Sequence, residues 1–309
     1  MLEVSIGALR LRNPVLTASG TFGHSTELAP FATYADLGAI VLKTVTPLPR
    51  PGNPPPRLFE TPAGMLNSIG LENRGVECFL AEELPAAAAL PVPVVVNIGA
   101  ETPGDFAALA ARVGDAPGCA AIEANLSCPN IQGGALPFSS TPQGCAEAVR
   151  RIRAATRKPL LVKLSPNVTR IADVARAAEG EGADALTAVN TLLGFAVDWR
   201  ARRPRLGAGW GGLSGPAIRP VALRMVYECA RAVSIPVVGC GGIASAEDVC
   251  EFLAAGATAV QVGTWNYVDP TAACRIAREL PGLLRSAGIR DVRELVGSVR
   301  VEEGGAAGG

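Results

Sequence analysis

The feature that most constrains the fold is a repeat of short apolar runs separated by Ala-rich segments with helical periodicity. Eight such runs begin at Pro14, Ala39, Val92, Ala120, Pro159, Ala185, Ile235 and Ala259. They are apolar nearly throughout instead of alternating, which is typical of parallel strands covered on both faces. Segments 173–182, 221–233 and 247–256 are amphipathic. Eight strand-helix units predict a closed (β/α)8 TIM barrel, with a doubly wound open sheet as the alternative.

Two segments lie outside this repeat. Residues 4–14, "VSIGALRLRNP", alternate and turn, so we expect an N-terminal β-hairpin that plugs the bottom of the barrel. Residues 194–216 form an insertion that is too long for a simple crossover, and we expect a flap between strands 6 and 7 over the top face. The sequence predicts a single barrel domain over residues 1–309, in which the tail from 302 to 309 is disordered.

The overall charge argues against two classes of partner. Lys and Arg together number 28, as do Asp and Glu, so the long-range attraction needed for nucleic acid or an anionic membrane surface is absent. We expect small molecules and other proteins as partners. The N-terminal residues lack the pattern of a signal peptide, and no apolar window is long enough to span a membrane, so a cytoplasmic location is expected.

Cysteine and histidine usage narrows the chemistry. Eight cysteines are scattered without a C-x-x-C pair, which argues against a disulfide framework and against a zinc or iron-sulfur site within the chain. Most of them are expected to be small apolar fillers. The single histidine, His24, excludes any scheme that needs two histidines, and we expect a loop or surface role for it.

The predicted strand ends are polar, as an active site in a TIM barrel requires. They carry Ser19, Gly20, Lys43, Thr44, Asn97, Asn125, Lys163, Asn190 and Thr191. Lys43 and Lys163 each lie in an apolar strand, where a buried ammonium costs several kcal/mol unless an anion or carbonyl oxygen receives it. We therefore favour ligand contact over a structural ion pair for both lysines.

Glycines follow the last two predicted strands, at Gly241, Gly242 and Gly263, and Thr264 comes directly after them. Such glycines let backbone N–H groups approach an anion closely, and phosphate sites of TIM barrels have this position. Simple turn glycines are the alternative. Taken with both lysines, the pattern indicates a phosphorylated cofactor or substrate across the barrel mouth.

Cys128 follows the fourth strand and precedes Pro129 and a loop that contains Gly133 and Gly134. A thiol with a pKa near 8.5 can act as a base near neutrality when neighbouring donors stabilise the thiolate. The residues alone leave a packing role and a catalytic role equally open.

Four asparagines fall in strand-end loops, at Asn67, Asn125, Asn130 and Asn190. Side-chain amides match a planar ligand with alternating carbonyl and N–H groups, such as a pyrimidine. For any one of the four, a turn-forming role is as good an explanation.

At these residues the sequence resembles a known family. The segments "NLSCPN", "VKLSPNVT", "GGLSGPAIRPVAL" and "GCGGI" resemble the class 1 dihydroorotate dehydrogenases, and "GNPPPRLFETPAGMLNSIGLEN" with "EELP" looks like the B type. The resemblance runs from about residue 3 to residue 290. It implies an FMN-dependent barrel enzyme that oxidises (S)-dihydroorotate to orotate in pyrimidine biosynthesis. Cys128 would then take the C5 proton while the C6 hydride goes to the flavin.

The resemblance also assigns binding roles. The substrate would be held by Lys43, Asn67, Ile69, Gly70, Leu71, Asn125, Asn130, Asn190 and Thr191. FMN would contact Ser19, Gly20, Lys43, Thr44, Asn97, Asn125, Lys163 and Val189, and its phosphate would rest on Gly215, Gly241, Gly242, Gly263 and Thr264. The loop after Cys128 would act as a lid that excludes water.

In the B type, electrons pass to NAD+ through a partner subunit that carries FAD and a [2Fe-2S] cluster. The resemblance therefore suggests such a partner, with a homodimer of this chain inside a heterotetramer. One departure is Trp265, in "GTWNYVDP", which is expected to affect packing near the phosphate or a subunit contact.

Other functions are weighed against this one. The first alternative is an A-type dihydroorotate dehydrogenase that uses fumarate. A tRNA-dihydrouridine synthase would need a basic surface, and a dihydropyrimidine dehydrogenase would carry cysteine-rich cluster segments. A non-catalytic flavin-binding subunit would have no reason to combine Cys128 with Lys43 and the asparagines.

Overall fold

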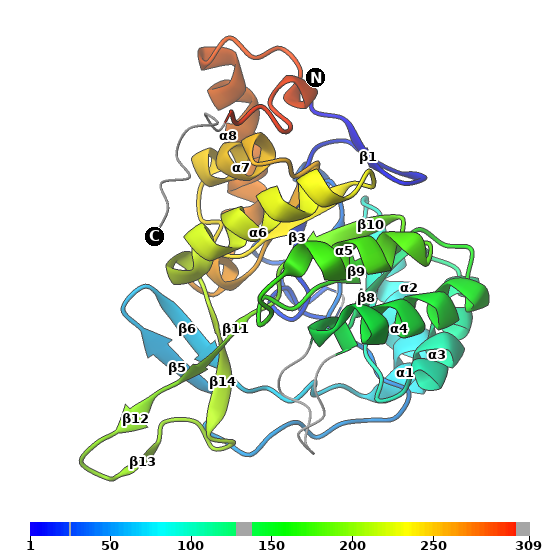
Figure 1. Ribbon diagram of the computed structural model, residues 1–309, viewed down its shortest axis with the longest axis vertical. Helices are drawn as coiled ribbons and strands as arrows, with labels where there is room; N and C mark the ends of the chain where they lie inside the picture. The colour runs from blue at the N-terminus through cyan, green and yellow to red at the C-terminus, as the bar shows by residue number, and fades with distance from the viewer. Residues whose placement is uncertain (25, 128–137, 301–309) are drawn as a thin grey trace.

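A computed structural model describes residues 1–24, 26–127 and 138–300 of the protein. Within these residues, eight parallel strands form one sheet in the order β3-β16-β15-β10-β9-β8-β7-β4 (Figure 1). Their bounds are β3 Val15–Thr17, β4 Ile40–Val41, β7 Val94–Ile98, β8 Cys119–Asn125, β9 Leu160–Lys163, β10 Ala185–Ala188, β15 Val237–Cys240 and β16 Ala259–Val262. A parallel bridge between Leu16 and Ala39 joins the two ends of the sheet. The predicted (β/α)8 barrel is therefore confirmed, with one strand in each apolar run.

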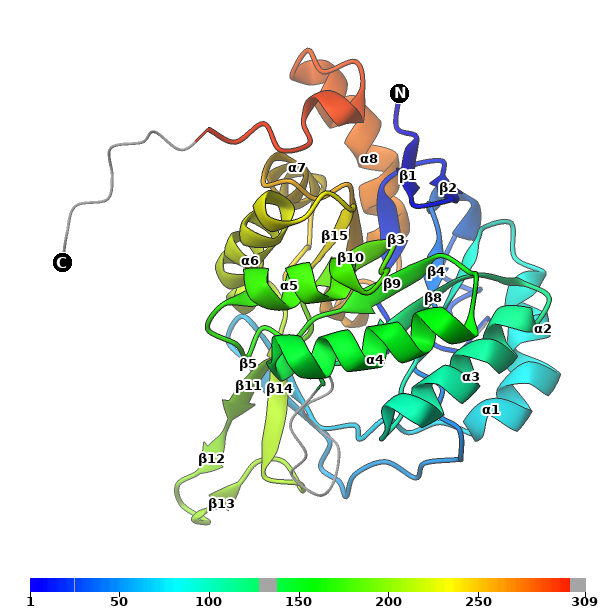
Figure 2. The ribbon, with the colours of Figure 1, turned by 45° about the vertical axis from the view of Figure 1, so that its right-hand side comes forward.

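Helices surround the barrel (Figure 2). Their bounds are α1 Gly75–Cys78, α2 Leu84–Ala88, α3 Pro103–Asp115, α4 Pro142–Ala155, α5 Ile171–Gly180, α6 Arg219–Ala232, α7 Ala246–Ala254 and α8 Ala272–Ser286. Local sequence explains where they start: Thr102 caps α3 by accepting from the backbone N–H of Asp105, and Ser245 and Asp248 form a capping box on α7. In the described part of the chain, no helix has the length and apolar character that crossing a membrane would require.

The first crossover differs from the expected strand-helix unit. In the described residues between β3 and β4, the only helical element is the short 3-10 helix η1 (Tyr34–Asp36), so the prediction of a helix in every unit is wrong here. Gly20, Gly23 and Pro30 interrupt this segment, and both glycines have positive φ angles, of 83° and 82°. Such backbone suits a loop and not a helix. Helix α8 packs against β3 and η1 and covers this side of the barrel.

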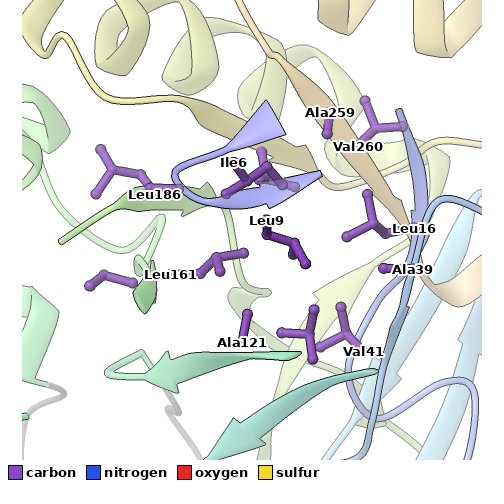
Figure 3. Packing of buried hydrophobic residues seen from close by; sticks show 14 of the residues in the cluster. Ile6, Leu9, Leu16, Ala39, Val41, Ala121, Leu161, Leu186, Ala259 and Val260 are labelled. Carbon is purple, nitrogen blue, oxygen red and sulfur yellow. The ribbon is translucent and has the colours of Figure 1, made fainter. Parts of the chain in front are cut away.

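The predicted N-terminal hairpin is confirmed. Strands β1 (Val4–Ile6) and β2 (Leu9–Leu11) pair antiparallel, with Val4 opposite Leu11. Ile6 and Leu11 are fully buried, whereas Ser5 on the other face of β1 is exposed. Figure 3 shows Ile6 and Leu9 among apolar side chains from several barrel strands, including Leu16, Ala121, Leu161, Leu186 and Val260. The hairpin therefore closes the bottom of the barrel with apolar side chains.

The flap is also present, but two insertions build it. Strands β11 (Leu192–Phe195) and β14 (Trp210–Ser214) come from the predicted segment, as do the short strands β12 (Val197–Asp198) and β13 (Arg203–Pro204). Strands β5 (Leu58–Thr61) and β6 (Gly64–Asn67) follow β4, and β6 pairs antiparallel with β14. The resulting sheet has the order β11-β14-β6-β5. It lies at the end of the barrel opposite the hairpin (Figures 1 and 2).

Removing the side chain of Ile6 should test the role of the hairpin as a structural plug. We expect Ile6→Ala to lower the free energy of unfolding by about 2–5 kcal/mol, because it leaves a cavity between the hairpin and the barrel strands. Ser5→Ala, on the exposed face of the same strand, should change it by less than about 0.5 kcal/mol. Urea denaturation measures both values. Equal stability of the two variants would contradict the plug.

Candidate active site

A single cavity at the carboxyl ends of the barrel strands collects nearly all of the described residues predicted for the site. Those that line it are Ser19, Gly20, Lys43, Thr44, Asn67, Ile69, Gly70, Leu71, Asn125, Lys163, Val189, Asn190, Thr191, Gly215, Gly241, Gly242, Gly263 and Thr264. Asn97 is fully buried and lies beneath the cavity instead of in its wall. Cys128 and Asn130 lie outside the described residues. The cavity is thus a place where these strand ends and loops meet.

Beneath the cavity, the carboxylate of Glu123 on β8 is fully buried. It accepts hydrogen bonds from Asn97 Nδ2 at 2.7 Å, from Thr187 Oγ1 at 2.7 Å and from Gln261 Nε2 at 2.5 Å. These donors come from three other barrel strands, β7, β10 and β16. A buried carboxylate is tolerated only when donors satisfy its oxygens, and this one is satisfied from several directions.

A chain of hydrogen bonds leads from this carboxylate to the cavity wall. The hydroxyl of Thr44 donates to Asn97 Oδ1 at 2.5 Å, and Asn125 Nδ2 lies 3.4 Å from Thr44 Oγ1. Asn125 Oδ1 in turn accepts from Asn190 Nδ2 at 3.3 Å and from the hydroxyl of Ser127 at 3.1 Å. Asn125 and Asn190, predicted from separate strand ends, are therefore direct neighbours.

The two lysines of the cavity have different surroundings. The ammonium of Lys163 lies 3.3 Å from Ser19 Oγ, 3.4 Å from Gln261 Oε1 and 3.9 Å from Glu123 Oε1. Its side chain is only 5% exposed. Lys163 therefore faces a structural carboxylate and also lines the cavity, and its contact with a ligand stays a prediction.

Lys43 is half-buried, and among the described residues no carboxylate lies within 4 Å of its ammonium. Desolvation by burial lowers the pKa of Lys43 from its ordinary value of 10.5, while the more distant carboxylate of Glu72 acts in the opposite direction. An anion brought into the cavity would relieve this penalty. Lys43 is therefore the described cation best placed to receive an anionic ligand.

At the other end of the cavity, glycines shape the wall. Gly241 and Gly242 have φ angles of 132° and 85°, which disfavour any residue with a side chain. A Cβ on Gly242 would lie 2.7 Å from Arg219 Cβ and 2.9 Å from the carbonyl oxygen of Gly215. Within the described residues, the backbone N–H groups of Gly241 and Gly242 have no hydrogen-bond acceptor. This combination of tight backbone and free donors fits a phosphate group.

The flap supplies the outer wall of the cavity. Leu58, Met65, Asn67 and Ser214 line it from β5, β6 and β14, and the side-chain amide of Asn67 donates to the carbonyl oxygen of Gly212 at 3.2 Å. The hydroxyl of Thr264 donates to Ser214 Oγ at 2.7 Å, which ties the flap to the strand end after β16. The cavity is therefore enclosed between the barrel mouth and the flap.

After β16, Trp265 lines the cavity next to Thr264 and is half-buried against the core. The hydroxyl of Tyr267 donates to the carbonyl oxygen of Gly20 at 2.9 Å. The two aromatic residues after Thr264 thus help to form the wall on the glycine side. Trp265 lies near the predicted phosphate position, one of the two expectations stated for it.

Cys119, Cys145 and the single histidine lie away from the cavity wall. Burial raises the pKa of Cys119 to about 11 and that of Cys145 to about 12, so these thiols are protonated at neutral pH. They behave as apolar fillers, as expected. His24 lies in the loop after β3, as predicted, and its Nδ1 is 2.9 Å from Glu83 Oε2.

Sequence reasoning missed Glu123, Gln261 and Ser214. Glu123 carries the same signal that identified the lysines, a charged residue inside an apolar strand run. Gln261 is likewise a polar residue within "AVQVGT". Ser214 lies on β14, which pairs with β6, a contact between segments almost 150 residues apart. Glu123 and Gln261 could have been found by considering every polar residue inside the apolar runs.

The chain is similar to known proteins over nearly its whole length. The sequence model of the family described as "Dihydroorotate dehydrogenase" matches residues 1–284. The chain is 52% identical over 295 residues to "Dihydroorotate dehydrogenase B (NAD(+)), catalytic subunit" of Desulforudis audaxviator, covering 96% of both chains. It is 50% identical over 298 residues to the protein of the same name in Trichlorobacter lovleyi, covering 96% of this chain and 98% of that one.

A solved structure supports the fold. The crystal structure of DHODH in complex with ferulenol from Eimeria tenella superposes with a TM-score of 0.80 at 24% identity, covering 96% of this chain and 88% of that one. At this identity the likeness concerns the fold alone. The family match and the relatives, which extend over nearly the whole chain, establish that this protein belongs to the dihydroorotate dehydrogenase family.

Proposed function

We propose that this chain is the catalytic subunit of an NAD+-linked dihydroorotate dehydrogenase and oxidises (S)-dihydroorotate to orotate in pyrimidine biosynthesis. The observation that carries the proposal is that two binding features line one cavity. One is the ammonium of Lys43, which has no anionic partner among the described residues. The other is the glycine cradle, formed by Gly241 and Gly242 with their free N–H groups. A phosphorylated cofactor and an anionic ring can thus lie side by side. The names of the relatives give dihydroorotate as their substrate, which supports the choice of the anionic ring. FMN as the phosphorylated cofactor is proposed from the family resemblance and from the glycines of the cavity wall.

FMN suits the residues that are present. Its phosphate would rest on Gly215, Gly241, Gly242, Gly263 and Thr264. A Cβ on Gly215, Gly241 or Gly242 would lie within 3.0 Å of neighbouring atoms, and the N–H groups of Gly241 and Gly242 are free, so this part of the wall has room for oxygens but not for added side chains. Ser19, Gly20, Thr44, Asn125, Lys163 and Val189 line the part of the cavity that would take the ring system. Asn97 would contribute from below, by holding Thr44. When bound, FMN supplies the acceptor for the hydride from C6 of the substrate.

The substrate would lie on the Lys43 side. The ammonium of Lys43 would pair with the carboxylate of dihydroorotate, and Asn67, Asn125 and Asn190 would offer amide donors and acceptors to the pyrimidine edge. Thr191 and the backbone of residues 69–71 line the same side of the cavity. Asn130, outside the described residues, is proposed to complete this set on the strength of the family resemblance.

Cys128 is proposed as the base that takes the C5 proton. It lies outside the described residues, but Ser127 directly before it is fully buried and hydrogen-bonded to Asn125 and Asn190. This anchors the chain next to the cavity just before Cys128. Among the described thiols, Cys240 lines the cavity, but burial raises its pKa, so it is protonated near neutral pH and is not available as a base.

The electrons are proposed to leave through a second subunit that carries FAD and a [2Fe-2S] cluster and reduces NAD+. The relatives are named catalytic subunits of an NAD(+) enzyme, which favours this route over an A-type enzyme that uses fumarate. A homodimer within a heterotetramer is the proposed assembly. Free thiols such as Cys78 and Cys250 suit the reducing cytoplasm, where we place the enzyme.

Adding a methyl group to the cradle should weaken FMN binding. In Gly242→Ala the new Cβ would crowd Arg219 and Gly215, so we expect FMN affinity to fall at least about tenfold, or 1.4 kcal/mol. Gly288→Ala is the matched control, because Gly288 also has a positive φ, of 75°, with nothing within 4 Å of its added Cβ. Quenching of FMN fluorescence on titration measures both affinities. Unchanged FMN affinity in Gly242→Ala would contradict the assignment of the phosphate to these glycines.

The base assignment predicts the behaviour of Cys128→Ala. Mixed anaerobically with (S)-dihydroorotate near pH 7, this variant should bleach its flavin about 10²–10⁴ times more slowly than the wild type, because proton removal loses its base. Cys250→Ala, which alters a thiol on the outer helix α7, should react at the wild-type rate. Stopped-flow absorbance follows the reaction. Bleaching of Cys128→Ala at the wild-type rate would show that another group takes the proton.

The lowered pKa of Lys43 predicts a pH dependence of product binding. Orotate would raise that pKa again by placing a carboxylate beside the ammonium, so binding takes up a proton in the alkaline range between the two pKa values. Affinity for orotate should therefore fall as the pH rises through the pKa of the free chain, by up to about tenfold per pH unit.

Two variants test this assignment. Lys43→Met should bind orotate weakly and without the alkaline decline, whereas Lys158→Met, at the opposite end of the barrel beside Cys119, should keep it. The flavin absorbance change on adding orotate at a series of pH values gives the dissociation constants. The same alkaline decline in Lys43→Met would assign the titration to another group.

A further inference from the structure

We propose that Glu123 is a positioning residue that aligns Lys163 and the amides of the cavity and sets the reduction potential of the bound cofactor. This inference rests on the proposed function only in taking FMN as that cofactor. Glu123 does not line the cavity, so any effect on the cofactor must pass through its neighbours or its charge. The hydrogen bonds around it allow both routes to be followed atom by atom.

The first step concerns the direction of two amides. All of the groups bonded to Glu123 are donors, since Asn97 and Gln261 each present their NH2 group and Thr187 its hydroxyl. A carboxylate offers only acceptors, so it fixes which end of each amide faces it. The oxygen of Asn97 must then point to Thr44, and the oxygen of Gln261 to Lys163.

The second step carries this direction to the cavity wall. Because the side chain of Asn97 presents its oxygen to Thr44, the hydroxyl of Thr44 donates its proton to Asn97 Oδ1. The hydroxyl oxygen of Thr44 can then accept from Asn125 Nδ2. Asn125 then presents its oxygen to Ser127 and Asn190. A single buried carboxylate thus decides which atoms Asn125 and Asn190 offer at the wall.

The third step concerns charge. The ammonium of Lys163 lines the cavity and lies 3.9 Å from Glu123 Oε1, with both side chains almost completely shielded from water. Such a pair interacts strongly, so Glu123 offsets much of the positive potential that Lys163 would project into the cavity. Two-electron reduction adds negative charge to a flavin. Loss of the negative charge of Glu123 would favour that reduction.

The direct test is the midpoint potential of FMN bound to Glu123→Gln, measured by reductive titration with xanthine oxidase and a reference dye. We expect a rise of at least about 30 mV, which corresponds to a tenfold shift of a two-electron equilibrium. Thr187→Val is the matched control, because it removes one hydrogen bond from the same carboxylate without changing any charge. Its potential should stay within about 10 mV of wild type, a threefold smaller shift.

A purely structural role for Glu123 would make both variants less stable and leave both potentials at the wild-type value. That outcome, or a fall in the potential of Glu123→Gln, would overturn the proposal. Because the titration uses a chemical electron source, it does not depend on dihydroorotate. A wild-type chain that binds FMN but is not reduced by dihydroorotate would contradict the proposed function and leave this comparison intact.

Glu123→Gln leaves a buried ammonium with no carboxylate beside it, which is itself destabilising. If this variant does not fold, a second pair keeps the proposal open to test. Lys163→Met and the double variant Glu123→Gln with Lys163→Met contain no unpaired buried cation. In Lys163→Met the carboxylate of Glu123 keeps its three hydrogen-bond donors, and removal of both charges is tolerated in other buried pairs. The double variant should have the higher potential of the two. Equal potentials would contradict the proposal.

Discussion

The carboxylate of Glu123, buried in the middle of the barrel, is the group on which the arrangement of the site depends. Left alone, a buried carboxylate would cost several kcal/mol, so its oxygens require donors. The barrel supplies them from β7, β10 and β16, together with the nearby ammonium of Lys163 on β9. Satisfying one buried charge thus fixes polar side chains on several strands at once. The hydrogen bonds that satisfy Glu123 therefore determine which donors and acceptors the cavity wall presents above it.

The two ends of the barrel are built for different tasks. At the bottom, the hairpin of β1 and β2 fills the barrel with apolar side chains such as Ile6. At the top, the strands end in lysines, amides and glycines under a flap formed by two insertions. Stability and chemistry are therefore largely separated along the barrel axis, as is usual in this fold. Changes in the hairpin should affect stability first, and changes at the strand ends should affect binding first.

Much of this could be predicted from local patterns. The apolar runs predicted all eight barrel strands, because strands covered on both faces need apolar residues throughout. Strand-end residues such as Lys43 and Asn190 line one cavity, because parallel strands end on the same side of the sheet. Contacts between distant segments could not be read in this way. The pairing of β6 with β14 depends on a register that neither segment encodes alone. The depth of Asn97 depends on how the strands are staggered, so a strand-end position did not reveal that it lies beneath the cavity.

The central claim is that one cavity holds FMN and dihydroorotate together, so the most direct measurement is an anaerobic titration of the purified chain with (S)-dihydroorotate. We expect the chain to carry one FMN, and each equivalent of substrate to bleach one equivalent of flavin and form one equivalent of orotate. This should occur without NAD+ or any partner subunit. A chain that retains FMN but is not bleached by excess dihydroorotate would contradict the account.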